Sequence, residues 1–226
     1  MAKSERIGIS WVSRWNLVEF FDTYVQSSIY PLERLTGVMR LLLNIKIEFY
    51  YILEVDLGLY NALVYDCGYD PNATLKSPYL LLRRHSLDQS IIVKSRILWE
   101  RIMNAIYYLE EGVQLEDKVS GRRSKKGVFF RFVKDHPCWR FLEPYEARLE
   151  QYDSQFRTPE VHKHSVLVTE LIGARTIELN DLLDLHNRAL NNVWENLISI
   201  VGGGKTVSFS DLHFGADGFI DPKFLE

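Results

Sequence analysis

The stretch SLDQSIIVKSRILWERIMNAIYYLEEG, residues 86–112, decides the fold that we predict for this chain of 226 residues. Its apolar residues recur three and four positions apart, the spacing that lines one face of an α-helix. Ser86 to Gln89 has the form of a capping box, and Gly112 suits the residue that follows a helix. The stripe consists of Ile91, Ser95, Leu98, Ile102, Ala105 or Ile106, and Leu109, widened by Ile92, Trp99 and Met103. We therefore expect a central helix from Ser86 to Gly112.

Similar spacings before this stretch predict two more helices. The first covers residues 10–27, and the second is a long helix over residues 32–65 that bends near Gly58.

After the stretch, Pro144 opens a short helix that ends near Asp153. Thr158 and Pro159 have the form of the N-cap and first residue of a helix that reaches Gly173. A last helix covers residues 177–201, ends at Gly202, and should pair antiparallel with the central helix. The sequence thus predicts an all-α bundle of about six helices, followed by an irregular tail over residues 203–226.

The composition is that of an ordinary globular protein, with 46% hydrophobic and 25% charged residues. No linker divides the chain, so residues 1–226 are predicted to form a single domain. The longest apolar stretch is interrupted by charges that a membrane span rarely carries, and the N-terminus lacks a secretion signal. Cys67 and Cys138 lack the spacing of a disulfide framework or a zinc site. These features predict a cytoplasmic protein without membrane anchor, metal or cofactor.

A basic segment runs from Lys118 to Lys134 without an acidic residue. Its Gly and Ser residues predict an exposed loop over residues 121–127, followed by a short helix. Such a loop either contacts RNA phosphates or is simply solvated surface. The residues that would bind RNA are Arg122, Arg123, Lys125 and Lys126, together with Lys163 from a later segment.

The segment FRTPEVHKHS, residues 156–165, holds the main candidate site. The free amides of a helix N-terminus attract phosphate and disfavour protonated imidazole, so His162 could act as a base. Arg157, just before the predicted cap, could hold a phosphate oxygen with two donors. The same residues also fit a plain helix start with solvated histidines.

Arg157 and His162 are separated by four residues, and in this spacing the chain resembles the HEPN domains, helical bundles with an Arg-x(4–6)-His motif. His164 falls within the same spacing, and Arg131 and His136 form another copy. The resemblance covers residues 86–201. It implies a homodimer whose motifs face one another, and a metal-independent ribonuclease of a toxin–antitoxin or antiviral defence system. RNA and a cognate antitoxin would then be its partners.

In that interpretation His162 transfers a proton while a ribose 2′-hydroxyl attacks the adjacent phosphodiester, and Arg157 stabilises charge on the phosphoryl oxygens. Glu100, in the middle of the central helix, either orients the imidazole of His162 or forms a structural ion pair. A different class of function also fits the sequence. The chain could be a non-catalytic helical module that binds another protein through its 12 Tyr, 12 Phe and 5 Trp residues.

Overall fold

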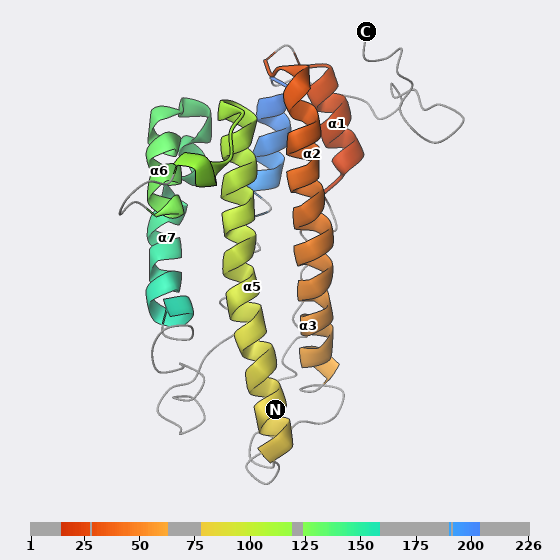
Figure 1. The fold of residues 1–226 in the computed structure, drawn as a ribbon, viewed down its shortest axis with the longest axis vertical. Helices are drawn as coiled ribbons and strands as arrows, with labels where there is room; N and C mark the ends of the chain where they lie inside the picture. The colour runs from red at the N-terminus through yellow and green to blue at the C-terminus, as the bar shows by residue number, and fades with distance from the viewer. Residues whose placement is uncertain are drawn as a thin grey trace, which may run out of the picture.

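The computed structural model describes residues 15–27, 29–62, 78–118, 124–158, 190 and 192–203. These residues form an all-α bundle without a strand, as the sequence predicts. Two long antiparallel helical segments lie side by side, and shorter helices surround one end of them (Figure 1). None of the described helices is both long and apolar enough to cross a membrane. The predicted helix that reaches Gly173 and the predicted tail beyond residue 203 lie outside the described residues.

The central element is α5 (Pro78–Glu111), a helix of 34 residues that is about 50 Å long. The predicted apolar stripe and the three residues that widen it are all buried. The predicted start is wrong, because Ser86 lies inside the helix and is exposed. Proline is tolerated in the first turn of a helix, and the Leu and Arg residues after Pro78 are good helix formers.

The predicted end of α5 is confirmed at Gly112. This glycine has a φ of 73°, and its N–H donates a hydrogen bond of 2.9 Å to the carbonyl oxygen of Tyr108. Such a left-handed residue satisfies one of the carbonyls that a helix end leaves unpaired. Arg34 satisfies two more, since its Nη1 donates to the carbonyl oxygens of Leu109, at 3.0 Å, and of Glu110.

The carboxylate of Glu110 joins α5 to two other parts of the bundle. Its Oε1 accepts hydrogen bonds from Tyr30 Oη and from Trp139 Nε1, each at 2.7 Å. Burial, together with the hydrogen bond to Glu110, raises the pKa of the Tyr30 hydroxyl. The segments that contain Tyr30 and Trp139 are therefore both hydrogen-bonded to the end of α5.

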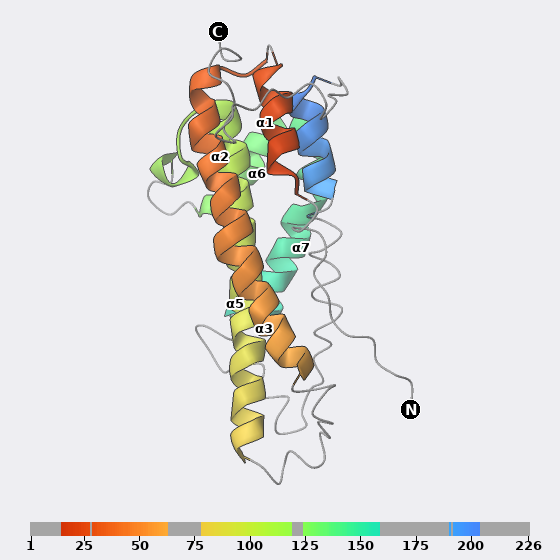
Figure 2. The ribbon, with the colours of Figure 1, turned by 90° about the vertical axis from the view of Figure 1, so that its right-hand side faces the viewer.

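The second long segment begins with η2 (Leu32–Arg34) and continues through α2 (Leu35–Asn44), η3 (Ile45–Tyr50) and α3 (Tyr51–Asn61). It lies antiparallel to α5 along most of its length (Figure 2). The long helix predicted from residue 32 is thus confirmed as far as residue 62. The expected bend near Gly58 is absent, because Gly58 lies within a regular α-helix, and the irregularity is the π-helical segment η3.

A polar contact fixes α3 against α5. Asp56 Oδ2 accepts hydrogen bonds from Ser90 Oγ, at 2.6 Å, and from Lys94 Nζ.

α1 (Leu17–Val25) begins later than predicted. The side-chain oxygen of Asn16 accepts hydrogen bonds from the N–H groups of Val18 and Glu19, at 3.1 and 3.2 Å, so Asn16 is the N-cap. Trp15, just before the cap, is buried and stacks on Trp194 with a centroid distance of 4.7 Å.

Residues 192–201 form the described part of the last helix, which ends at Gly202 and Gly203 as predicted. Trp194 lies at the start of α1, and Gly203 lies next to Ile29, beyond the end of α1. The neighbouring Tyr30 reaches the end of α5. Residues 192–201 therefore run in the same direction as α5 (Figure 1), and the predicted antiparallel pairing is wrong. Apolar periodicity is identical for both directions of a helix and could not distinguish them.

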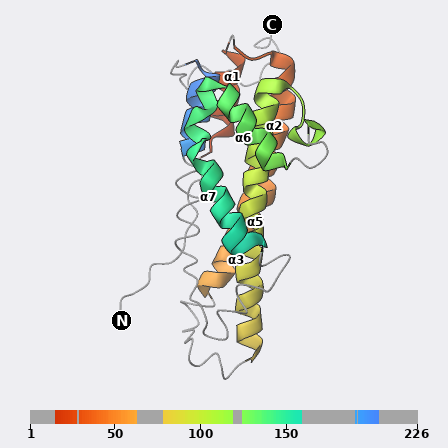
Figure 3. The same cartoon turned by 90° about the vertical axis from the view of Figure 1, so that its left-hand side faces the viewer.

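The remaining helices pack beside the C-terminal half of α5 (Figure 3). They are η5 (Leu115–Lys118), α6 (Lys125–Asp135), η6 (Pro137–Leu142), α7 (Pro144–Tyr152) and η7 (Asp153–Arg157). Pro144 opens α7, as predicted. α6 begins earlier than the predicted short helix because Ser124 Oγ caps it, accepting a hydrogen bond of 3.1 Å from the N–H of Gly127. Lys125 and Lys126 consequently belong to a helix and not to the predicted loop.

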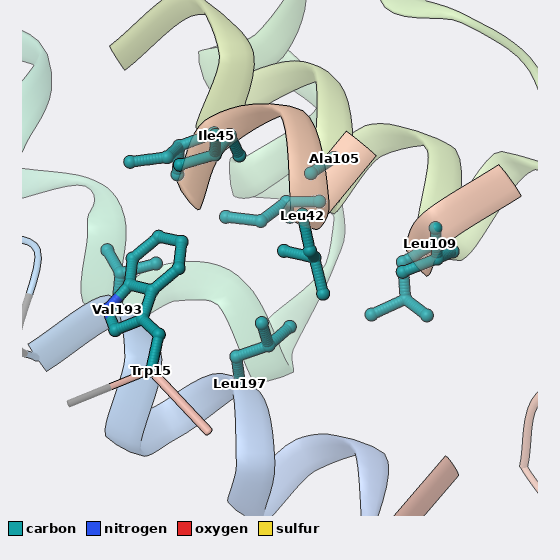
Figure 4. Close-up of a pocket in the computed structure, with 10 residues that line it drawn as sticks. Trp15, Leu42, Ile45, Ala105, Leu109, Val193 and Leu197 are labelled. Atoms are coloured by element: carbon teal, nitrogen blue, oxygen red, sulfur yellow. The ribbon is translucent and has the colours of Figure 1, made fainter. Parts of the chain in front are cut away.

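The core of the bundle contains a small gap where side chains from α2, α5 and residues 192–201 converge (Figure 4). They leave a gap of only about 10 Å³, lined by Trp15, Leu42, Ile45, Ala105, Leu109, Val193 and Leu197 among others. Such a space holds at most about one water molecule. The gap is therefore part of the packed core and not a ligand site.

Replacing Glu110 should weaken the whole bundle. In Glu110→Gln a neutral amide replaces the carboxylate that accepts from Tyr30 and Trp139, so we expect the free energy of unfolding to fall by about 1–3 kcal/mol. Glu150→Gln is the control, because the Glu150 side chain is 71% exposed and its replacement should change stability by less than about 0.5 kcal/mol. Urea denaturation followed by circular dichroism measures both. Equal effects would show that the Glu110 contacts do not stabilise the fold.

Two glycines should respond to alanine in opposite directions. Gly112→Ala forces a side chain into the left-handed region, 3.0 Å from Arg34 Nε, and should lower the free energy of unfolding by about 1–2 kcal/mol. Gly58→Ala places a methyl group in open space within α3 and should raise it by about 0.5–1 kcal/mol. Thermal unfolding of the two variants tests this, and a stabilised Gly112→Ala protein would contradict the helix end described above.

Candidate functional site

The main predicted site is only partly described. Arg157 lies in the described residues, whereas His162, Lys163 and His164 lie outside them. Whether Arg157 and His162 come together is therefore still a prediction.

The local structure at Arg157 differs from the predicted helix start. Arg157 ends η7, a π-helical turn that continues α7, and Thr158 has helical backbone angles of −68° and −44°. Thr158 is thus not an N-cap, although a residue before proline usually avoids this region. The free amides of a helix start, which we expected to attract phosphate next to Arg157, are not found at Thr158.

Glu100 takes part in an ion-pair network at the base of η7. Arg96, whose side chain is only 7% exposed, binds Asp153 with a distance of 2.7 Å from Nε to Oδ1. The same guanidinium lies 3.3 Å from Glu100 Oε1 through its Nη1. Glu100 therefore has the structural ion pair that the sequence left open, and a further role toward His162 stays a prediction.

The predicted RNA-binding residues divide into two groups. Arg122 and Arg123 lie outside the described residues. Lys125 forms an ion pair with Glu116, and Lys126 lies 3.5 Å from Glu150 and 3.7 Å from Asp153. The helical register of α6 turns these lysines toward acids on neighbouring elements, so their charge is already balanced within the protein.

The other Arg–His copy, Arg131 with His136, lies in a described groove between α5, η5 and α6. The groove has a volume of about 310 Å³ and is open to solvent. Its lining consists of Tyr107, Glu111, Lys118, Val128, Arg131, Phe132, Asp135 and His136. Arg131 and His136 therefore line one shared surface, which their sequence spacing alone could not show.

The packing of α6 explains why Arg131 faces this groove. Phe129, Phe130 and Val133 are buried in the core, which leaves the opposite side of the helix exposed. Arg131 and Asp135 are four residues apart and share that exposed side. Phe132 is buried too, between this side and the core, and the His136 ring packs against it at a tilt of 33°, with a centroid distance of 4.1 Å.

The imidazole of His136 has a defined orientation at the end of α6. Its Nδ1 lies 2.9 Å from the carbonyl oxygen of Phe132. A carbonyl oxygen only accepts, so we assign the proton to Nδ1. Nε2 is left for other partners, and it lies 3.7 Å from Oε1 of Glu111. The side chain of His136 is 33% exposed, so Nε2 is available for proton exchange with a ligand.

The charges of the groove are mixed. Lys118 and Arg131 are exposed and form no ion pair with another described residue, in contrast to Lys125, Lys126 and Lys134. Glu111 and Asp135 contribute carboxylates. Burial, and next the Glu111 carboxylate, raise the pKa of Tyr107, which therefore stays protonated near neutral pH. The lining therefore brings two cations, two carboxylates and the His136 imidazole together.

The groove combines groups that can hold an anion with groups that can move a proton. Arg131 offers a planar fork of donors that matches phosphate, and Lys118 adds a second cation. The imidazole of His136 belongs to the side-chain type that most often transfers protons in catalysis. Among the described residues no cluster of His, Cys, Asp and Glu has a metal-binding arrangement.

No protein-family model, curated protein or solved structure matches the chain. The similarity to HEPN domains accordingly stays a prediction from the sequence.

The sequence does not predict Glu111 and Tyr107 as site residues. In the sequence, Glu111 is only a polar residue at the end of α5, and Tyr107 is only one of its apolar positions. One signal in the sequence could have pointed to this groove. The basic segment begins at Lys118, a few residues after the end of α5, so basic residues were to be expected close to Glu111.

The two acids that pair with Arg96, Asp153 and Glu100, should contribute unequally to the free energy of unfolding. Asp153→Ala leaves a buried guanidinium without its closest partner, and we expect it to lower the free energy of unfolding by about 3 kcal/mol. Glu100 is 31% exposed, so Glu100→Ala should cost less than about 1 kcal/mol. Chemical denaturation of both variants tests this order. A Glu100→Ala protein as unstable as Asp153→Ala would overturn it.

Proposed function

We propose that this protein binds RNA in the groove between α5, η5 and α6 and cleaves it without a metal ion. The observation that carries the proposal is that Arg131 and His136, which have the Arg-x4-His spacing, line one solvent-open groove. The proposal moves the site from Arg157 and His162 to the other copy of the motif.

The phosphodiester would be held by the two cations of the groove lining, Arg131 and Lys118, neither of which forms an ion pair with another described residue. Arg131 would bind two phosphoryl oxygens and stabilise the charge that they gain in the transition state. Lys118, from η5, would contribute to the same anion site. Lys125 and Lys126 support this assignment by contrast, because acids already neutralise them.

Proton transfer would be the role of His136. Its Nδ1 is bound to the Phe132 carbonyl, which fixes the ring and leaves Nε2 for the substrate. Attack of a ribose 2′-hydroxyl on the adjacent phosphorus would produce a cyclic phosphate and a free 5′-hydroxyl. This chemistry needs the 2′-hydroxyl and would therefore be confined to RNA.

The proposal retains what the resemblance to HEPN domains implies. It includes a homodimer, a cognate antitoxin and a role in a toxin–antitoxin or antiviral defence system, with the protein located in the cytoplasm. Light scattering of the purified chain would test the homodimer.

The alternative, a non-catalytic interaction module, was based on the many aromatic residues. Among the residues whose side-chain exposure the structure describes, the exposed large apolar side chains are aliphatic, whereas Trp15, Trp99 and Trp139 belong to the core. Buried aromatic residues cannot bind a partner, so these residues support the alternative less than the aromatic composition of the sequence does.

Cleavage of a labelled single-stranded RNA in the presence of EDTA tests the proposal. Wild-type protein should produce fragments that end in a cyclic phosphate. Arg131→Ala and His136→Asn should each lower the rate by at least about 100-fold. Lys134→Ala is the matched control, because Lys134 lies on the same helix but pairs with Glu146 outside the groove.

Arg157→Ala and His162→Ala complete the series. If these variants lose cleavage while Arg131→Ala and His136→Asn keep it, the site lies at residues 157–162 and the groove assignment is wrong. If wild-type protein cleaves no RNA, the proposed activity is wrong and the interaction module is the better interpretation.

A further inference from the structure

A carboxylate faces the reactive nitrogen of His136. Glu111 is the last residue of α5, and its Oε1 lies 3.7 Å from His136 Nε2. Its side chain is 39% exposed, so the carboxylate can also reach a ligand in the groove. Glu111 comes from α5 and His136 from the end of α6, so the packing of these helices brings the two groups together.

We infer that Glu111 is the second proton-transfer group of the groove and acts as the general base, with protonated His136 as the general acid. This assignment rests on the proposed function. It concerns a residue outside the Arg–His motif and assigns each of the two groups one role.

A second proton-transfer group is needed because His136 offers only one ring nitrogen to a ligand. Cleavage by a 2′-hydroxyl needs one group to remove the hydroxyl proton and another to protonate the leaving 5′-oxygen. Nδ1 of His136 is bound to the Phe132 carbonyl, so only Nε2 is available. One nitrogen cannot take and give a proton within the same displacement, and Glu111 is the acid nearest to it that the structure records.

The proton balance of the step is complete. The Glu111 carboxylate takes the proton of the 2′-hydroxyl, and the 2′-oxygen forms a bond to phosphorus. The bond from phosphorus to the 5′-oxygen breaks, and His136 Nε2 gives its proton to that oxygen. The products are a 2′,3′-cyclic phosphate and a 5′-hydroxyl. Glu111 ends protonated and His136 neutral, and exchange with water restores both.

The surroundings of Glu111 define the expected pH dependence. The other charged or titratable groups of the lining are Lys118, Arg131, Asp135 and Tyr107, and burial raises the pKa of Tyr107. Cleavage should fall at low pH as the base is protonated and at high pH as His136 loses its proton. The rate should therefore follow a bell-shaped curve.

The backbone at Glu111 is held in place by the contacts of its neighbours. The preceding residue, Glu110, is held by Tyr30, Trp139 and Arg34, and the following Gly112 ends the helix. The carboxylate of Glu111 thus extends from a fixed point, although its own side chain can move.

The test is the pH profile of RNA cleavage by Glu111→Gln. We expect kcat/KM to fall by at least about 100-fold and the acidic limb of the profile to disappear. Binding of an RNA with a 2′-deoxy nucleotide at the cleavage position should change by less than about threefold, because glutamine keeps the size of the side chain. Glu111→Asp should restore the acidic limb at a lower rate.

Glu146→Gln is the matched control, since this surface glutamate pairs with Lys134 outside the groove and should leave the profile unchanged. An active Glu111→Gln protein that keeps the acidic limb would overturn the inference and leave the proposed function intact. Loss of the acidic limb in Asp135→Asn, but not in Glu111→Gln, would do the same. An inactive wild-type protein would instead show that the proposed function itself is wrong.

Discussion

The hydrogen bonds at the C-terminal end of α5 fix the arrangement on which the groove depends. A helix leaves its last carbonyls without partners, and here Arg34 and Gly112 satisfy them. The Glu110 carboxylate adds bonds to Tyr30 and Trp139, so the segment before α2 and the segment after α6 meet at this point. η5 and α6 follow directly after it, and their positions are set by where α5 ends.

Charge pairing decides which basic residues can meet a ligand. The basic segment is uniform in sequence, but Lys125, Lys126 and Lys134 are bound to acids, whereas Lys118 and Arg131 line the groove and form no ion pair with another described residue. An ion pair holds a side chain in place and offsets its charge, so paired lysines attract an anion less. The groove therefore combines these two cations with the carboxylates of Asp135 and of Glu111, and Glu111 belongs to the proposed chemistry.

Sequence patterns predicted which segments are helical better than they predicted the residue at which each helix begins. The buried stripe of α5 and the stops at Gly112 and Gly203 follow from side-chain spacing and from the left-handed backbone that glycine accepts. The sequence predicts N-caps at Ser86 and Thr158 because Ser and Thr are common there, yet both lie in helical backbone. A capping side chain acts only where the helix actually begins, and neighbouring helix formers and packing decide that position.

The sequence by itself determined that the chain is helical, where α5 ends, and that Arg and His recur with four residues between them. The two copies share this spacing, and the sequence favours Arg157 and His162 because Thr158 and Pro159 predict a helix start there. Only the tertiary structure placed Arg131, His136 and Glu111 in one groove, and only it showed that residues 192–201 run parallel to α5. The physical reason is that periodicity has no direction, and that contacts such as Arg96 with Asp153 join residues far apart in the chain.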